Sequence, residues 1–172
     1  MNDQKMPNFL LDAQTASFMQ YAEREFFAAM RLGYASAKSG IKSSWLPGSK
    51  TIEFKIGHLR VTDTYFIVGE STHSGGYTVI HWGPIPLWVM FYSGSYPKEA
   101  IPCLKAALLT TYERSKFDGG RGPSNYLHRG YRYTNRAEGN FSKFHGEETI
   151  YGPGDGIVGG HRYHGLYLAT KA

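Results

Sequence analysis

The chain has 172 residues, of which 41% are hydrophobic and 19% charged, and its formal net charge is +5. This composition excludes a disordered chain, and the length predicts one domain over residues 1–172, with residues 1–8 as a loose N-terminal tail. No apolar run approaches the roughly 20 residues that span a bilayer, and the N-terminus lacks the features of a signal peptide, so we expect a cytoplasmic protein without membrane contact.

The N-terminal part of the sequence predicts a helix followed by a β-hairpin. Apolar residues recur at three- and four-residue spacing from Phe18 to Met30, and Ser17 with Gln20 offers a capping box. After a polar turn region over residues 36–49, the apolar pattern changes to period two. Residues 52–56 and 59–68 are therefore predicted strands, joined by a turn at Gly57-His58.

The rest of the chain predicts more strands and one further helix. The helix begins at Pro97 or Pro102 and ends at Ser115, and a loop over residues 118–125 follows it. The predicted strands cover residues 77–82, 87–92, 131–134, 141–151 and 161–169. We therefore expect an α+β fold, in which a mostly antiparallel, strongly twisted sheet packs against an N-terminal helix and a central helix.

Two acidic residues interrupt apolar strand faces. Alternation places Asp63 on the same face as Val61 and Tyr65, and it places Glu148 on the face of Ile150. A buried carboxylate is costly unless it is paired, so a shared interior would raise the pKa of one carboxyl or require a cation between them. Two interpretations stay open: the carboxyls line a pocket, or backbone amides, tyrosine hydroxyls or buried water satisfy them.

Several short motifs together resemble a known family. They are Gly48-Ser49-Lys50, Asp63-Thr64-Tyr65-Phe66, Pro86-Leu87-Trp88-Val89-Met90, Arg121-Gly122-Pro123 and the spaced Phe144, Gly146, Glu148 and Ile150. In order and spacing they resemble an uncharacterised bacterial domain family over nearly the whole chain after Phe9. Its members stand alone or follow a helix-turn-helix of the xenobiotic-response type in regulators. The resemblance implies motif positions at Lys50, Asp63, Tyr65, Trp88, Arg121 and Glu148, but no activity.

Other candidate motifs do not fit their usual chemistry. The glycines of residues 154–159 have dinucleotide-loop spacing, but a strand follows them where a helix is required, so they predict a hairpin loop. His161 and His164 lie three apart on a strand and face opposite ways, which argues against a metal site. Cys103 falls within a helical apolar pattern and is expected to be an inert buried thiol. No cofactor is predicted.

Three functional hypotheses remain. The first is a small-ligand-binding or sensing module, in which Asp63 and Glu148 orient an unidentified small molecule, Tyr65 and Trp88 form apolar walls, and Lys50 or Arg121 supplies charge. The second is an enzyme that uses Asp63 and Glu148 as paired acid and base carboxylates. The third is a protein-interaction or homo-oligomerisation domain that uses its aromatic surface and strand edges. No recognition helix is evident, so the sequence does not favour nucleic acid as a partner.

Overall fold

The computed structural model describes residues 15–34, 41–42 and 46–169. In chain order the elements are α1 (Thr15–Tyr34), β1 (Ile41–Lys42), β2 (Ser49–Ile56), β3 (Leu59–Ile67), β4 (His73–Trp82), β5 (Ile85–Ser95), the 3-10 turn η2 (Lys98–Ala100), α2 (Ile101–Arg114), β6 (Asn125–His128), β7 (Tyr131–Asn140), β8 (Lys143–Tyr151) and β9 (Ile157–Tyr167). The predicted N-terminal tail lies outside the described residues.

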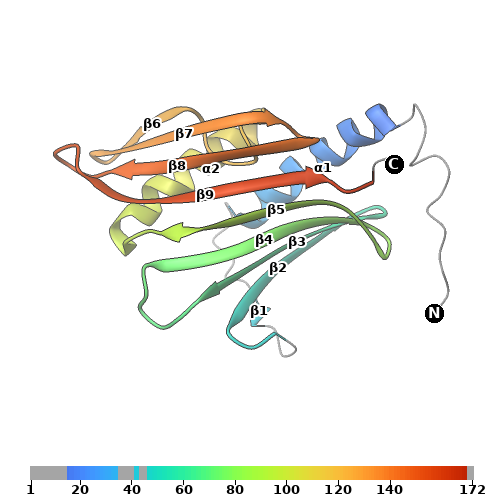
Figure 1. Ribbon diagram of the computed structural model, residues 1–172, viewed down its shortest axis with the longest axis horizontal. Helices are drawn as coiled ribbons and strands as arrows, with labels where there is room; N and C mark the ends of the chain where they lie inside the picture. The colour runs from blue at the N-terminus through green and yellow to red at the C-terminus, as the bar shows by residue number, and fades with distance from the viewer. Residues whose placement is uncertain (1–14, 35–40, 43–45, 170–172) are drawn as a thin grey trace.

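The nine strands of the described residues form one antiparallel sheet in the order β1-β2-β3-β4-β5-β9-β8-β7-β6. β1 to β5 pair in chain order, and so do β6 to β9. Pairing of β5 with β9 joins the two halves at the centre of the sheet, and α2 connects β5 to β6 (Figure 1). The predicted α+β fold with an antiparallel sheet, an N-terminal helix and a central helix is therefore confirmed.

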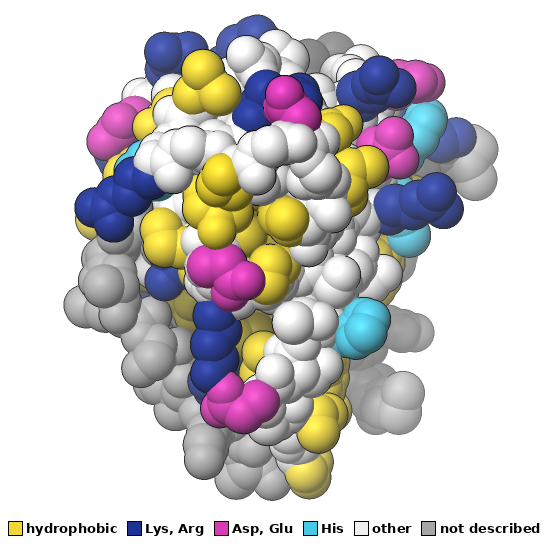
Figure 2. All heavy atoms as spheres, turned by 90° about the vertical axis from the view of Figure 1, so that its left-hand side faces the viewer, with side chains coloured by type: hydrophobic (Ala, Val, Ile, Leu, Met, Phe, Trp, Pro, Cys, Tyr) yellow, Lys and Arg dark blue, Asp and Glu magenta, His cyan; other side chains and the backbone are white. Residues whose placement is uncertain are grey.

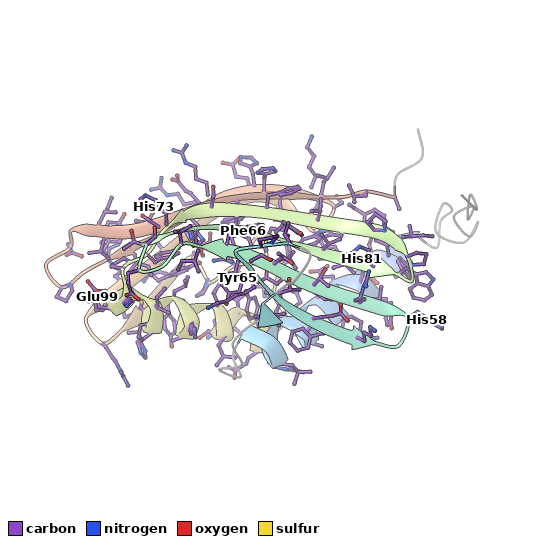
Figure 3. The ribbon with its side chains drawn as sticks, turned by 90° about the horizontal axis from the view of Figure 1, so that it is seen from below. His58, Tyr65, Phe66, His73, His81 and Glu99 are labelled. Carbon is purple, nitrogen blue, oxygen red and sulfur yellow. The ribbon has the colours of Figure 1, made fainter. Side chains whose placement is uncertain are left out.

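Both helices lie against the same face of the sheet, which we call the inner face (Figures 1 and 3). We call the opposite face the outer face. The core between the helices and the inner face comprises Ala22, Phe26, Phe27, Ala29 and Met30 of α1, Cys103, Leu104, Ala107, Leu108 and Tyr112 of α2, and Leu59, Val61, Ile80, Trp88 and Met90 of the sheet. Each large apolar side chain buried there contributes about 1.5–3 kcal/mol relative to exposure. No helix of the described residues has the length and apolar content to cross a bilayer.

The antiparallel register arranges the inner-face side chains in rows that cross the strands. One row contains Ile52, Asp63, Thr78 and Met90. The next contains Lys50, Tyr65, Gly76, Tyr92 and Tyr163. A third contains Ile67, Ser74, Gly94, His161 and Glu148. Positions directly opposite on neighbouring strands are side-by-side neighbours, so these rows set which polar groups meet.

Several element boundaries differ from the sequence prediction. The helix α1 already includes Thr15, so Ser17 lies within it and is not its cap. The short strand β1 falls in the predicted turn region, and β6 was not predicted, since only its first residue, Asn125, lies in the predicted loop. Neither strand has enough residues to show a period-two pattern. Phe141 was assigned to the start of a strand, but it lies in the turn between β7 and β8, where its side chain packs into the core.

Candidate functional site

Asp63 is buried in the middle of β3, with 4% of its surface exposed. Its Oδ1 accepts hydrogen bonds from Thr78 Oγ1 at 2.7 Å and from Tyr92 OH at 3.0 Å. Thr78 is the register partner of Asp63 on β4, whereas Tyr92 reaches across Gly76, where a side chain would collide with the hydroxyl. The second carboxyl oxygen, Oδ2, is buried and accepts no hydrogen bond from any residue that the structure describes.

This environment alters the proton affinity of Asp63. Burial raises the pKa of its carboxyl, and this effect exceeds the opposing effects of the two hydrogen bonds and of the Arg121 charge. A buried acceptor without a partner costs about 1–3 kcal/mol. The unpartnered Oδ2 therefore carries an energetic cost that a hydrogen-bond donor would remove.

Glu148 is also buried, with 1% of its surface exposed, but its carboxylate is fully engaged. Arg121 donates to Oε1 from Nε at 3.0 Å and also from Nη2. Tyr133 donates from its hydroxyl to Oε2 at 2.6 Å. Burial alone would raise the pKa of Glu148, but the charge and hydrogen bonds of Arg121, together with the other bonds, hold it below its usual value. Glu148 is therefore ionised at neutral pH and paired.

The loop between α2 and β6 brings Arg121 beneath the sheet. Gly122 N donates to the Tyr133 hydroxyl at 2.9 Å, and Asn135 Nδ2 donates to the carbonyl of Gly122 at 2.7 Å and to that of Asp118 at 2.9 Å. These bonds fix the loop to β7. The backbone on both sides of Arg121 is therefore held in place. This keeps the guanidinium in contact with Glu148, which offsets the cost of burying its charge.

The two carboxyl groups belong to one network. Tyr92, which donates to Asp63, lies beneath the Arg121 guanidinium, whose Cζ is 5.4 Å from the ring centroid. The Arg121 charge acts on both Asp63 and Glu148. Asp63 and Glu148 nevertheless differ in state, because Arg121 hydrogen-bonds Glu148 and lowers its pKa, whereas burial outweighs the Arg121 charge at Asp63. The paired-carboxylate hypothesis needs two carboxyls with reactive oxygens, and both oxygens of Glu148 accept hydrogen bonds.

Lys50 and Tyr65 lie beside Asp63 on the inner face. They are register partners on β2 and β3, and both are half-buried. Figure 3 shows the side chain of Tyr65 on the helix side of the sheet and that of the next residue, Phe66, on the other side. The interior next to Asp63 is thus bordered by residues that retain solvent contact.

Trp88 has a different environment from the other residues of the resemblance. It is fully buried, stacks on Phe141 and Phe144, and contacts Phe26. Its Nε1 donates to the carbonyl of Phe141 at 2.8 Å. The prediction that Trp88 lies inside is confirmed, and its contacts are those of a core residue.

Sequence reasoning missed the role of His161. The prediction that His161 and His164 face opposite ways is confirmed, since His161 is buried on the inner face and His164 is exposed on the outer face. His161 Nδ1 lies 3.7 Å from Glu148 Oε1, and Nε2 lies 3.2 Å from Ser74 Oγ. Burial, followed by the nearby Arg121 charge, lowers the pKa of His161 to about 4. A histidine on an apolar strand face, like Asp63 and Glu148, was the signal available.

The remaining candidates occupy ordinary positions. Cys103 is buried, as predicted, and burial raises the pKa of its thiol. Within the described residues, no three histidine, cysteine or acidic side chains come close enough to hold a metal ion.

Comparison with known protein families identifies one match. Residues 63–168 match the model of a Domain of unknown function (DUF5680), and the chain belongs to this family. Asp63 is the first matched residue, and Tyr65, Trp88, Arg121 and Glu148 fall within the match, whereas Lys50 lies outside it. The resemblance assigned to the whole chain after Phe9 was thus wider than the match. No curated protein and no solved structure matches the chain significantly.

Proposed function

We propose that this member of the family is a small-ligand-binding module whose ligand donates a hydrogen bond to Oδ2 of Asp63. The observation that carries the proposal is the buried Oδ2 of Asp63, which accepts no hydrogen bond from the described residues. A ligand that supplies an amino or hydroxyl donor would remove the penalty of that oxygen. Because this penalty exists only in the folded protein without ligand, its removal adds directly to binding.

The neighbours of Asp63 indicate what else the ligand contacts. Tyr65 offers a half-buried ring on one side, and Lys50 offers an ammonium group next to it. These residues suit a compact molecule with a planar or apolar part and an acidic substituent. Arg121 and Glu148 contribute indirectly, because they hold Tyr92 against Oδ1 and leave Oδ2 as the available acceptor.

A thermal-shift screen of amino- and hydroxyl-bearing metabolites tests this proposal, with Asp63→Asn as the loss-of-site variant. A ligand at 100 times its Kd stabilises a protein by about 2.7 kcal/mol, which corresponds to roughly 5–10 °C for a chain of this size. We expect such a shift for the wild-type protein and none for Asp63→Asn. The matched control is Asp155→Asn, which neutralises an exposed carboxylate and should retain the full shift.

Two outcomes would count against the ligand site. The first is that no compound stabilises the wild-type protein at high concentration. The second is that a compound stabilises the wild-type protein and Asp63→Asn equally, because its site then lies elsewhere. Titration of Lys50→Met with the same compound measures the contribution of the ammonium group, which we expect to be about 1–2 kcal/mol for a charged partner.

The outer face favours a second candidate function, self-association. Phe91, Leu166 and Phe66 of this face are 44%, 39% and 37% exposed, and Phe91 contacts Tyr77 and His164. Neither α1 nor α2 covers this face (Figure 3). We propose that a second copy of the chain packs here, since Arg162 and Glu147 offer both signs of charge to a symmetric partner. Sedimentation should show a dimer that Phe91→Ser dissociates, and a wild-type monomer at high concentration would refute it.

A further inference from the structure

A serine, a histidine and a glutamate follow one another across the strands, in one register row of the inner face. Ser74 of β4, His161 of β9 and Glu148 of β8 are connected by the 3.2 Å contact between Ser74 Oγ and His161 Nε2 and the 3.7 Å contact between His161 Nδ1 and Glu148 Oε1. This is the order in which a hydroxyl, a general base and an orienting carboxylate are arranged in acyl-transfer sites.

The contact between Ser74 and His161 requires a glycine at the position between them. Gly94 of β5 occupies the row position between Ser74 and His161, and a side chain there would collide with the His161 ring and with the carbonyl of Gly160. The rings of Tyr92 and Tyr96 contact the imidazole, with centroids at 5.8 Å and 4.5 Å. His161 therefore has little room to rotate away from Ser74.

The surroundings also select the tautomer of His161 that can act as a base. Nδ1 lies 3.7 Å from Oε1 of the ionised Glu148, too far for a hydrogen bond, and it makes no hydrogen bond to any described residue. The negative charge of Glu148 nevertheless favours the ring proton on this nitrogen. Nε2 is then the acceptor and takes the hydroxyl proton of Ser74. The lowered pKa keeps the imidazole neutral at pH 7 with this lone pair available, and it also makes Nε2 a weaker base than an ordinary histidine.

Accessibility increases along the row from Glu148 to Ser74. Glu148 and His161 are buried, Ser74 is half-buried, and Ile67 at the end of the row is 38% exposed. Ser74 also lines a shallow hollow of about 500 Å³, together with Phe66, Ile67 and Val68. Figure 2 shows the end of the molecule that carries the β3–β4 and β8–β9 turns, where hydrophobic side chains lie among charged ones. The exposed apolar residues of these turns are Ile67, Val68, Ile157 and Val158.

We propose that Ser74 is a nucleophilic serine, activated by His161 and oriented through Glu148, that is acylated by small esters or thioesters with an apolar acyl group. The Ser74 proton passes to His161 Nε2 as Oγ forms a bond to the acyl carbon. The bond from that carbon to the leaving oxygen or sulfur breaks, and the leaving group takes the proton from Nε2. Water then repeats the sequence on the acyl-serine and restores the free hydroxyl, so no oxidant or reductant is needed.

The proposal is independent of the ligand site at Asp63 and has a separate test. The purified chain is incubated with a short-chain alkyl fluorophosphonate, in which Oγ attacks phosphorus and fluoride leaves, and the adduct is located by peptide mass spectrometry. We expect one adduct, on Ser74, that is absent in Ser74→Ala. Ser93→Ala, which changes another serine lining the same hollow, should be labelled at the wild-type rate.

The role of His161 is tested by the labelling rate of folded His161→Gln, which should fall by about 100-fold or more, the usual contribution of a general base. If that variant does not fold, Ser74→Cys retains every partner. Its alkylation by iodoacetamide should then be at least tenfold faster than that of Ser93→Cys. The proposal is wrong if folded wild-type protein forms no Ser74 adduct with millimolar reagent. It is equally wrong if folded His161→Gln reacts at the wild-type rate or the two cysteine variants react equally fast.

Discussion

Arg121 directs two of its donors, Nε and Nη2, to the same oxygen of Glu148, and the other oxygen accepts the Tyr133 hydroxyl. Both residues of this ion pair are buried. A pair of this kind adds little net stability compared with apolar residues of the same size, but the loss of one partner leaves a buried charge without compensation. The pair therefore fixes the α2–β6 loop to the sheet more than it strengthens the fold.

This asymmetry predicts the effect of neutralising one partner. Glu148→Gln should lower the free energy of unfolding by about 3–5 kcal/mol, because Arg121 stays charged and buried. The neighbouring residue provides the control: Glu147→Gln, on the exposed outer face, should change stability by less than about 0.5 kcal/mol. The double variant Arg121→Met/Glu148→Met should recover most of the loss. Denaturant unfolding measures all three, and equal effects of Glu148→Gln and Glu147→Gln would contradict the structural role of the pair.

The sequence predicted the class of the fold and the burial of both carboxyls, because each depends on local alternation. It also led to the expectation that a shared interior would raise one pKa or place a cation between the acids. Both occur, since burial raises the pKa of Asp63 and Arg121 pairs with Glu148. Local patterns could not show which acid Arg121 would hydrogen-bond, because that choice depends on a loop held by Tyr133 and Asn135.

His161 and Ser74 could not be associated from the sequence for a related reason. They are 87 residues apart, and their contact requires β5 to pair with both β4 and β9, with Gly94 at the crossing position. The strand order depends on the connection from β5 to β6 through α2, and the periodic pattern of the sequence does not show where that connection leads. Sequence reasoning therefore placed individual residues on faces correctly, but it could not determine which residues meet across strands.

Asp63→Asn should increase the stability of the protein at neutral pH. The folded-state pKa of Asp63 is raised, so the folded protein holds this proton more tightly than the unfolded chain does. The stabilising contribution of the protonated form is complete below the unfolded pKa of about 3.9 and is lost as the pH rises through the folded pKa. We expect Asp63→Asn to be more stable than the wild-type protein by roughly 1 kcal/mol at pH 7, and the difference to shrink toward pH 4.

Thermal or denaturant unfolding of both proteins at several pH values measures this effect. Asp155→Asn is the control, because that carboxylate is exposed and its removal should leave the pH dependence unchanged. A destabilised Asp63→Asn at pH 7 would show that the ionised carboxylate is satisfied in the folded protein. The penalty on Oδ2, from which the ligand site is inferred, would then not exist.

The lowered pKa of His161 predicts that the protein loses stability in mild acid. Its folded-state pKa is about 4, below the usual 6.5, so between these values the unfolded chain binds a proton that the folded protein does not. The contribution of neutral His161 is present above pH 6.5 and decreases as the pH falls toward 4, by at most about 3 kcal/mol. His161→Gln should flatten this part of the stability profile, whereas His164→Gln, at the exposed position, should not. Identical slopes in the two variants would place the acid sensitivity elsewhere.

Gly146 provides a test of the inner-face packing that supports the network. It lies on β8 opposite Tyr163 of β9, and an added side chain would collide with the Tyr163 hydroxyl and with the carbonyl of Arg136. That hydroxyl donates to Asn135 Oδ1 at 2.6 Å, and Asn135 in turn holds the loop that carries Arg121. Gly146→Ala should therefore destabilise the fold by about 1–3 kcal/mol, the usual effect of overpacking.

The matched control is Gly156→Ala in the β8–β9 turn, where an added side chain meets nothing within 4 Å. We expect that variant to unfold within about 0.5 kcal/mol of the wild-type protein. If Gly146→Ala is as stable as Gly156→Ala, the space beside Tyr163 is not filled as the structure shows, and Asn135 is positioned by other contacts.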